Sequence, residues 1–277
     1  MTEYAHPDAL VSTQWLEDHL TDTDLRILEV DMSPEPYQQA HLPGAVFWNI
    51  FTDLLLPDLR MNLEQTNFEQ LMGRSGISPE STVIAYGSYP GTGAWIFWLL
   101  KYFGHERVKV LNGGYQQWQR EGRPLAAELS TFAARSYQSS GTAPDLRVCY
   151  QEVAEALDQP DRVVLDVRTS QEYRGEWFIT QPPTPLERAG HIPGAVHIDH
   201  HLTLNEDGTF KSMTELQALF FSKGVTPDRE ILPYCAIGGR SGYIWFVLTY
   251  LLGYPQVRNY EGSWNEWSRL SHLPVQR

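Results

Sequence analysis

Cys235 begins a short segment whose residue types suit nucleophilic sulfur chemistry. The segment reads CAIGGRS over residues 235–241, after an apolar, β-like run at 230–234 and before a helical pattern. Two glycines let backbone N–H groups turn inward and form an anion-binding nest, to which a helix N-terminus adds partial positive charge. We expect a cysteine placed there to be largely thiolate near neutral pH, with Arg240 as a fixed positive charge at the rim. The segment therefore predicts a site where an anion meets a nucleophilic sulfur.

The alternative is a small, inert cysteine buried at the end of a strand. The Gly-Gly turn and Arg240 argue against that alternative for Cys235. Cys149 has no such surroundings, so we interpret it as structural. Two cysteines make no disulfide framework, and the N-terminus shows no signal-peptide pattern, so we expect a cytoplasmic location.

The surroundings of Cys235 occur twice in the chain. HLPGAV at 41–46 returns as HIPGAV at 191–196, and VIAYG at 83–87 aligns with ILPYC at 231–235. A third block, 110–118, aligns with 258–267. A period of about 150 residues is too long for a solenoid repeat and indicates two whole domains. We predict an inactive domain over 1–125, a linker over 126–145 and a catalytic domain over 146–277.

Both halves alternate strand-like and helical runs, which predicts an α/β fold with a mostly parallel sheet flanked by helices in each domain. The predicted strands are 27–31, 45–48, 82–86, 108–111, 162–167, 194–198, 230–234 and 256–260. The predicted helices are 68–73, 94–103, 212–221 and 242–252. Residues 172–189, with three prolines, form an irregular excursion of the kind that is often functional.

The composition limits the kinds of partner that the protein is expected to bind. The chain has 277 residues, 42% of them hydrophobic, and a formal net charge of −13. Such a charge argues against nucleic acid and anionic membranes as partners. A local pocket can still oppose the global charge, so an anionic substrate remains open. The apolar stretches are too short to span a bilayer.

Together these marks resemble a tandem-domain sulfurtransferase of the rhodanese family. The marks are the two His-x-Pro-Gly-Ala turns, DVR at 166–168, EDGTFKS at 206–212, the Cys235 loop and YEGSW at 260–264. The resemblance implies that Cys235 takes sulfur from a donor such as thiosulfate as a persulfide. Cyanide, another thiol or a protein acceptor then removes that sulfur. No cofactor or metal is predicted.

The resemblance also implies roles for further residues. Arg188 falls where related enzymes place a substrate-binding arginine, and Arg174 is a weaker candidate. His41 could approach the cleft, although a turn-capping role is favoured. The substrate-binding loop would comprise Ala236, Ile237, Gly238, Gly239, Arg240 and Ser241.

The matching loop of the first half has lost these features. Gly87 stands where the second half has its cysteine, and Thr92 stands where it has Arg240. Pro90 in the same loop also lacks an N–H donor. We therefore expect the first domain to be a catalytically inactive wall of the cleft.

Alternatives remain at three levels. A phosphatase of the same fold has five residues between cysteine and arginine, whereas four separate Cys235 from Arg240. Among sulfur donors, thiosulfate is favoured over 3-mercaptopyruvate because Arg240 suits a compact dianion. A non-enzymatic binding module is disfavoured by the retained cysteine. The run HIDHH at 197–201 has metal-site residue types, but strand alternation would send His197 and Asp199 to the face opposite His200.

Overall fold

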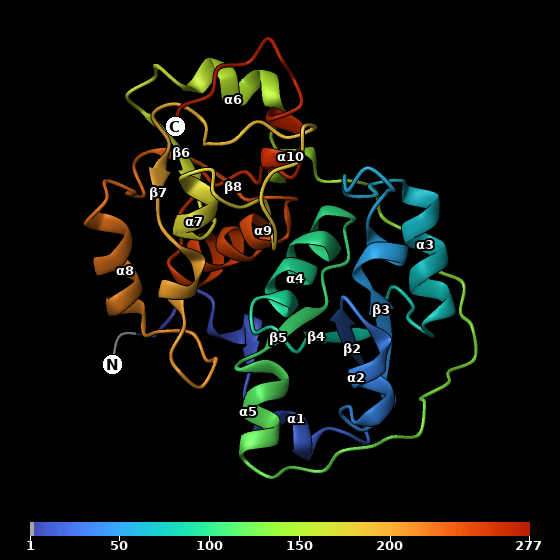
Figure 1. Cartoon of the computed structure of the whole chain (residues 1–277). Coiled ribbons are helices and arrows are strands. Elements are labelled where there is room, and N and C mark those ends of the chain that lie inside the picture. The colour runs from blue at the N-terminus through green and yellow to red at the C-terminus, as the bar shows by residue number, and fades with distance from the viewer. Residues whose placement is uncertain (1–2) are drawn as a thin grey trace.

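The first half of the chain builds one parallel sheet in a computed structural model that describes residues 3–277 (Figure 1). Within those residues its strands run in the order β1 (Leu10–Val11), β5 (Val108–Leu111), β4 (Thr82–Tyr86), β2 (Leu25–Asp31) and β3 (Ala45–Asn49). β2 lies inside this sheet and is buried along nearly its whole length. Continuous apolar strands are typical of parallel sheets with both faces covered. The covering helices are α1 (Thr13–Asp18), α2 (Pro34–Gln39), α3 (Gln65–Arg74), α4 (Thr92–Tyr102) and α5 (Gly114–Arg120).

The second half repeats this topology with a shorter sheet. Its described strands are β7 (Val196–His197), β6 (Arg162–Asp166) and β8 (Glu230–Tyr234), all parallel. Parallel bridges from Ile231 to Val257 and from Arg147 to Asn259 extend the order, so that it mirrors the first sheet. The mixed α/β class and the two-domain architecture predicted from the sequence are confirmed.

The predicted strand 256–260 is wrong as a regular strand, and a proline explains why. Ile231 donates its N–H to Gln256, and Arg258 and Tyr260 donate theirs back to Ile231 and Pro233. The next ladder bond would require an N–H from Pro233, which has none. Only isolated bridges therefore form along this edge of the described sheet.

The second-half helices are α6 (Tyr150–Ala156), α7 (Ser170–Tyr173), α8 (Met213–Phe221), α9 (Gly239–Phe246) and α10 (Ser263–Trp267). The predicted helix 242–252 begins earlier, at Gly239, and continues from Val247 to Leu251 as a π-helical turn. The segment after α5 crosses the surface of the first half (Figure 1). No helix within residues 3–277 has the length and apolar character needed to cross a membrane.

Helices α4 and α9 occupy matching places in the two halves, and they pack against each other at the centre of the molecule (Figure 1). A Cβ at Gly91, the N-cap of α4, would lie 3.0 Å from the ring of Tyr243. A Cβ at Gly239, the first residue of α9, would lie 3.2 Å from the ring of Trp95. Each helix thus begins with a glycine that receives an aromatic ring from the other helix. This reciprocity is the pattern of a two-fold interface, here within one chain.

The interface joins the two halves into one hydrophobic core. Buried side chains of α4 and α9 belong to the same cluster, and the rings of Phe97 and Phe246 meet edge to face at 4.8 Å. Because the N-terminal ends of both helices meet here, the loop at 87–91 faces the Cys235 loop. The interface therefore decides which first-half residues reach the cysteine.

We expect Trp95→Ala to destabilise the whole chain. Trp95 is 5% exposed, and truncating a buried tryptophan costs about 3–5 kcal/mol. The matched control is Trp177→Ala, because Trp177 is 41% exposed. Thermal unfolding should show a midpoint lower by roughly 2–4 °C per kcal/mol for Trp95→Ala only. Equal midpoints for the two variants would mean that the interface contributes little to stability.

Candidate active site

The Cys235 sulfur lies between β8 and α9, with one backbone donor and two hydroxyl groups around it. The N–H of Gly238 donates to the Sγ atom at 3.1 Å, and the Ser241 and Ser263 hydroxyls lie 3.6 and 3.9 Å from it. Gly238 has a φ of 94°, and a Cβ there would lie 2.5 Å from the carbonyl oxygen of Glu261. Only glycine fits this position without strain. The loop therefore places a backbone N–H within hydrogen-bond distance of the sulfur, with two hydroxyl groups close by.

Ser263 supports the loop from outside and was not predicted as a site residue. Its hydroxyl accepts the N–H of Cys235 at 3.0 Å and donates to the carbonyl of Tyr260. Ser263 has a φ of 53°, uncommon for a residue other than glycine. The N–H of Trp264 also donates to the Cys235 carbonyl at 2.9 Å. The start of α10 therefore holds the Cys235 loop in place.

Arg240, predicted as a fixed positive charge at the rim, is paired with a carboxylate. Its guanidinium forms two hydrogen bonds to the carboxylate of Glu172, at 2.6 and 2.7 Å. Glu172 is fully buried and also accepts the N–H groups of Thr169 and Ile179. Burial alone would raise the pKa of Glu172, but Arg240 outweighs it and lowers that pKa to about 2. The pair is nearly neutral, and it fastens the excursion 172–189 to the Cys235 loop.

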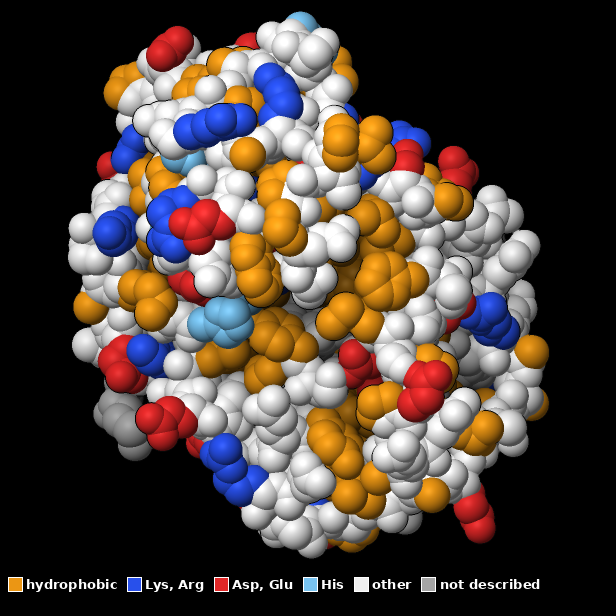
Figure 2. Space-filling model, viewed as in Figure 1, with side chains coloured by type: hydrophobic (Ala, Val, Ile, Leu, Met, Phe, Trp, Pro, Cys, Tyr) orange, Lys and Arg blue, Asp and Glu red, His pale blue; other side chains and the backbone are white. Residues whose placement is uncertain are grey.

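A pocket of about 290 Å³ opens over Cys235 between the two halves. Figure 2 shows hydrophobic side chains gathered around a hollow near the centre of this face. The second half lines the pocket with Ile179, Thr180, His200, His201, Cys235, Ala236, Ile237, Gly239, Arg240 and Tyr243. The first half lines it with Asp31, Met32, Ile50, Phe51, Tyr89, Gly91, Thr92 and Trp95. Nearly half of the lining therefore comes from the half without the cysteine.

The first-half loop leaves no room for a side chain at Gly87, the position that aligns with Cys235. A Cβ at Gly87 would lie 2.5 Å from the Val30 carbonyl and 2.9 Å from the Cβ of Thr92. Tyr89 of the same loop instead reaches the shared pocket, where its buried hydroxyl has no hydrogen-bond partner among the described residues. Burial raises the pKa of Tyr89, so the phenol stays protonated.

The histidine-rich run divides between the pocket and the sheet. The donor atoms of Asp199, His200 and His201 lie within 4.8 Å of one another, because a 3-10 turn over His200–Thr203 ends the predicted alternation. His197 lies apart, stacked on Tyr173 and bonded through Nε2 to the carbonyl of Arg168. Hydrogen bonds account for the arrangement of the three clustered side chains, because His201 bonds Asp199 and His200 bonds the Val167 carbonyl.

Five of the predicted residues do not line the pocket: Gly238 and Ser241 contact the Cys235 sulfur instead, and Arg188, Arg174 and His41 bond elsewhere. Arg188 donates to the carbonyls of Trp267, Ser268, Leu270 and Leu273, which it ties together after α10. Arg174 is exposed and pairs with the neighbouring Glu176. His41 is buried against Tyr37, whose carbonyl bonds its Nδ1, in keeping with the turn-capping role.

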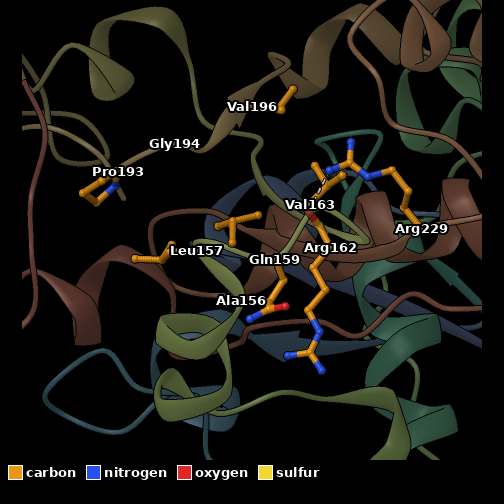
Figure 3. Close-up of a pocket in the computed structure, with 10 residues that line it drawn as sticks. Ala156, Leu157, Gln159, Arg162, Val163, Pro193, Gly194, Val196 and Arg229 are labelled. Atoms are coloured by element: carbon orange, nitrogen blue, oxygen red, sulfur yellow. Dashed lines mark hydrogen bonds between the residues drawn. The ribbon is translucent and has the colours of Figure 1, made fainter.

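A second hollow lies near the HIPG turn and carries no nucleophile (Figure 3). Two arginines line it, with guanidinium groups that point in different directions. Arg162 pairs with Glu230, and Arg229 donates to the carbonyls of Gly224 and Arg162. These arginines brace the chain around β6, so the chemistry is assigned to the Cys235 pocket.

Fold and site together define a duplicated α/β protein with one cysteine-centred pocket, and comparison with known proteins agrees. A rhodanese-like domain model matches residues 12–121 and 150–270. The sulfur carrier protein TtuD of Thermus thermophilus is 43% identical over 98% of both chains. A candidate thiosulfate sulfurtransferase of Haloferax volcanii is 40% identical over 100% of this chain and 98% of its own. The chain belongs to the rhodanese family.

The fold also matches a solved structure of a more distant protein. The anaerobic ergothioneine biosynthesis enzyme of Chlorobium limicola, with trimethyl histidine bound, superposes with a TM-score of 0.88. The match covers 100% of this chain and 72% of the other at 24% identity. At that identity the likeness concerns the fold alone.

We expect Glu172→Gln to lower stability in a pH-dependent way. The carboxylate has a pKa of about 2 when folded against an ordinary 4.5, so its contribution is full above pH 4.5 and is lost as the pH falls through 2. The shift corresponds to about 3 kcal/mol. Urea unfolding should show that deficit at pH 7 and a smaller one at pH 3.

Glu176→Gln is the matched control for that experiment, because Glu176 makes only an exposed ion pair with Arg174. Such pairs contribute little, so the control should unfold like the wild type. A Glu172→Gln deficit that stayed constant between pH 7 and pH 3 would contradict the assigned role of the ion pair.

Arg188→Met tests the substrate-binding prediction directly. The variant removes the donors that serve four carbonyls, so we expect a lower thermal midpoint and a KM for thiosulfate within about two-fold of wild type. Arg174→Met, which removes one surface pair, should change neither quantity. A KM raised ten-fold or more in Arg188→Met alone would restore the substrate-binding role.

Proposed function

We propose that the chain is a sulfurtransferase that moves sulfane sulfur from thiosulfate to a thiophilic acceptor through a persulfide on Cys235. The Cys235 thiolate attacks the outer sulfur of thiosulfate and forms the new S–S bond. The S–S bond of thiosulfate breaks, and sulfite leaves with its electron pair. The observation that carries the proposal is the Cys235 Sγ, which lies 3.1 Å from the Gly238 N–H within a shared pocket.

The second half-reaction returns the cysteine to its starting state. Cyanide attacks the outer sulfur of the persulfide and leaves as thiocyanate, while the Cys235 thiolate recovers the electron pair. The loop from Ala236 to Ser241 provides the N–H groups that stabilise the charge on sulfur. In this proposal the first half is inactive and serves as the opposite wall of the pocket.

Thiosulfate is supported by several family relatives that are named for this donor, including the Haloferax protein. The Arg240 charge supports it less than the sequence suggested, because Glu172 neutralises most of that charge. Thiosulfate must instead be bound by the N–H groups at the start of α9 and by the side of the Arg240–Glu172 ion pair that lines the pocket. 3-Mercaptopyruvate is therefore kept as the alternative sulfur donor.

Sulfur relay to a protein acceptor is a second candidate function. Its support is the similarity to a protein named as a sulfur carrier and the apolar rim of the pocket. Met32 and Phe51 on that rim are 55% and 46% exposed. Exposed apolar side chains beside a reactive group are suited to contact with another protein.

Thiocyanate formation with cyanide tests the proposal, with thiosulfate and 3-mercaptopyruvate offered in parallel. We expect faster turnover with thiosulfate, and complete loss of turnover in Cys235→Ser because no persulfide can form. Cys149→Ser is the matched control and should keep the wild-type rate, since Cys149 bonds Glu152 at the start of α6.

The outcomes separate the alternatives. Faster turnover of 3-mercaptopyruvate would keep the persulfide chemistry and replace the donor. Turnover that survives Cys235→Ser would remove the proposed nucleophile. Persulfide formation on Cys235 without thiocyanate release would favour relay to a protein acceptor.

A further inference from the structure

We propose that His201 is the proton acceptor for sulfur transfer to a thiol, acting with Asp199 as a dyad on the wall of the Cys235 pocket. The proposal rests on the persulfide chemistry of the proposed function and concerns its second half-reaction. Both His201 and Cys235 line the same pocket. The dyad lies on the turn that follows β7.

The geometry of the dyad fixes which nitrogen can exchange a proton. The Asp199 carboxylate lies 2.9 Å from Nδ1 of His201 and accepts the backbone N–H of the same residue at 3.1 Å. A carboxylate only accepts hydrogen bonds, so Nδ1 carries the hydrogen in this contact. Nε2 is then the basic nitrogen. A carboxylate that orients an imidazole in this way is a recurring arrangement around catalytic histidines.

Side chains packed around the dyad contact it and leave the His201 ring accessible. The ring of His200 lies 4.0 Å from that of His201, and Tyr89 from the first half meets it edge-on at 6.0 Å. The Asp199 carboxylate also lies 3.4 Å from Nδ1 of His200. The His201 side chain remains 57% exposed, so an acceptor entering the pocket can reach it.

The other ionisable side chains of the described pocket are committed to fixed states near neutral pH. Burial lowers the pKa of His200 to about 3, and its Nδ1 bonds the Val167 carbonyl, so it stays neutral. Burial raises the pKa of Tyr89 and of Tyr243. Arg240 is bound by Glu172.

Asp31 and Cys235 already have other roles in the described pocket. Asp31 accepts the N–H groups of Met32 and Ser88, and Cys235 is the nucleophile. Histidine is the side chain that most often serves as a general base. Within the described lining, His201 combines an exposed ring with a carboxylate that orients it, so we assign the proton transfer to this residue.

The chemistry needs such a group in only one half-reaction. A thiol such as a cysteine has a pKa of about 8.5 and is mostly protonated at pH 7. His201 removes the proton from R–SH, and the thiolate attacks the outer sulfur of the Cys235 persulfide. The S–S bond to Cys235 breaks, Cys235 recovers the electron pair as thiolate, and the proton returns to the new persulfide as R–S–SH. Thiosulfate, sulfite and cyanide anion react without this proton.

The test measures the second half-reaction alone. Cys235 is loaded with inorganic polysulfide, so the step is observed whether or not thiosulfate is a donor. Single-turnover transfer is then followed from pH 6 to pH 9 with 2-mercaptoethanol and, separately, with sulfite. The proteins are the full chain, His201→Gln, Asp199→Asn and the surface control His272→Gln.

We expect His201→Gln to slow transfer to 2-mercaptoethanol by about 100-fold at pH 7, the lower end of general-base effects. The deficit should shrink as the pH approaches the pKa of the thiol. Transfer to sulfite should change within about two-fold, which also shows that the variant is folded. Asp199→Asn should fall between wild type and His201→Gln, and His272→Gln should match wild type.

Equal slowing with both acceptors, or no slowing with either, would overturn the role of His201. Loading by polysulfide but not by thiosulfate would overturn the proposed donor. The role of the dyad would then be decided by the rates of transfer to 2-mercaptoethanol and to sulfite. A Cys235 that takes sulfur from neither source would overturn both proposals.

Discussion

The reciprocal packing of α4 against α9 is the contact on which the rest of the molecule depends. Gly91 leaves room for Tyr243 and Gly239 leaves room for Trp95, so glycine at the start of each helix favours their close approach. The same approach brings the N-terminal loops of both helices to one pocket. The continuity of the core and the shared lining of the pocket therefore both follow from this single interface.

The two halves share internal architecture beneath that interface. In the first half, the hydroxyl of Tyr86 joins Glu29 to the N–H of Leu42. In the second half, the hydroxyl of Tyr234 joins Asp166 to the N–H of Ile192. Each tyrosine thus pins the His-x-Pro-Gly turn to the end of the central strands. The repeated turn motif is therefore a packing feature of both halves, including the half without a nucleophile.

The halves differ in how that buried carboxylate is balanced. Arg168 pairs with Asp166 in the second half, and it lies over the ring of Trp264. Asp31 follows Glu29 at the corresponding spacing in the first half, so no cation arrives there. Burial consequently raises the pKa of Glu29 to about 7, despite the bond from Tyr86. The first half has kept the scaffold without the charge balance of the second.

Features built from residues that are consecutive in the chain could be predicted from the sequence. The Cys235 loop could be predicted because a strand, two glycines and a helix start are consecutive, and the duplication could be predicted because whole motifs recur. Glu172 as the partner of Arg240 could not, since only the fold unites residues so far apart in the chain. Arg188 was misleading because carbonyls at the chain's C-terminal end compete for its donors. His201 was missed because strand alternation was expected over 197–201, and that pattern separated the side chains of this run.

The crowding around Gly87 has an evolutionary consequence. Because the Val30 carbonyl and Thr92 occupy the space of a side chain, a single mutation that restored cysteine there would clash before it could react. A cysteine at position 87 would need the backbone to retreat at the same time as the side chain changed. The two loops therefore differ by more than one substitution, and a single change of residue would not make the first loop equivalent to the second.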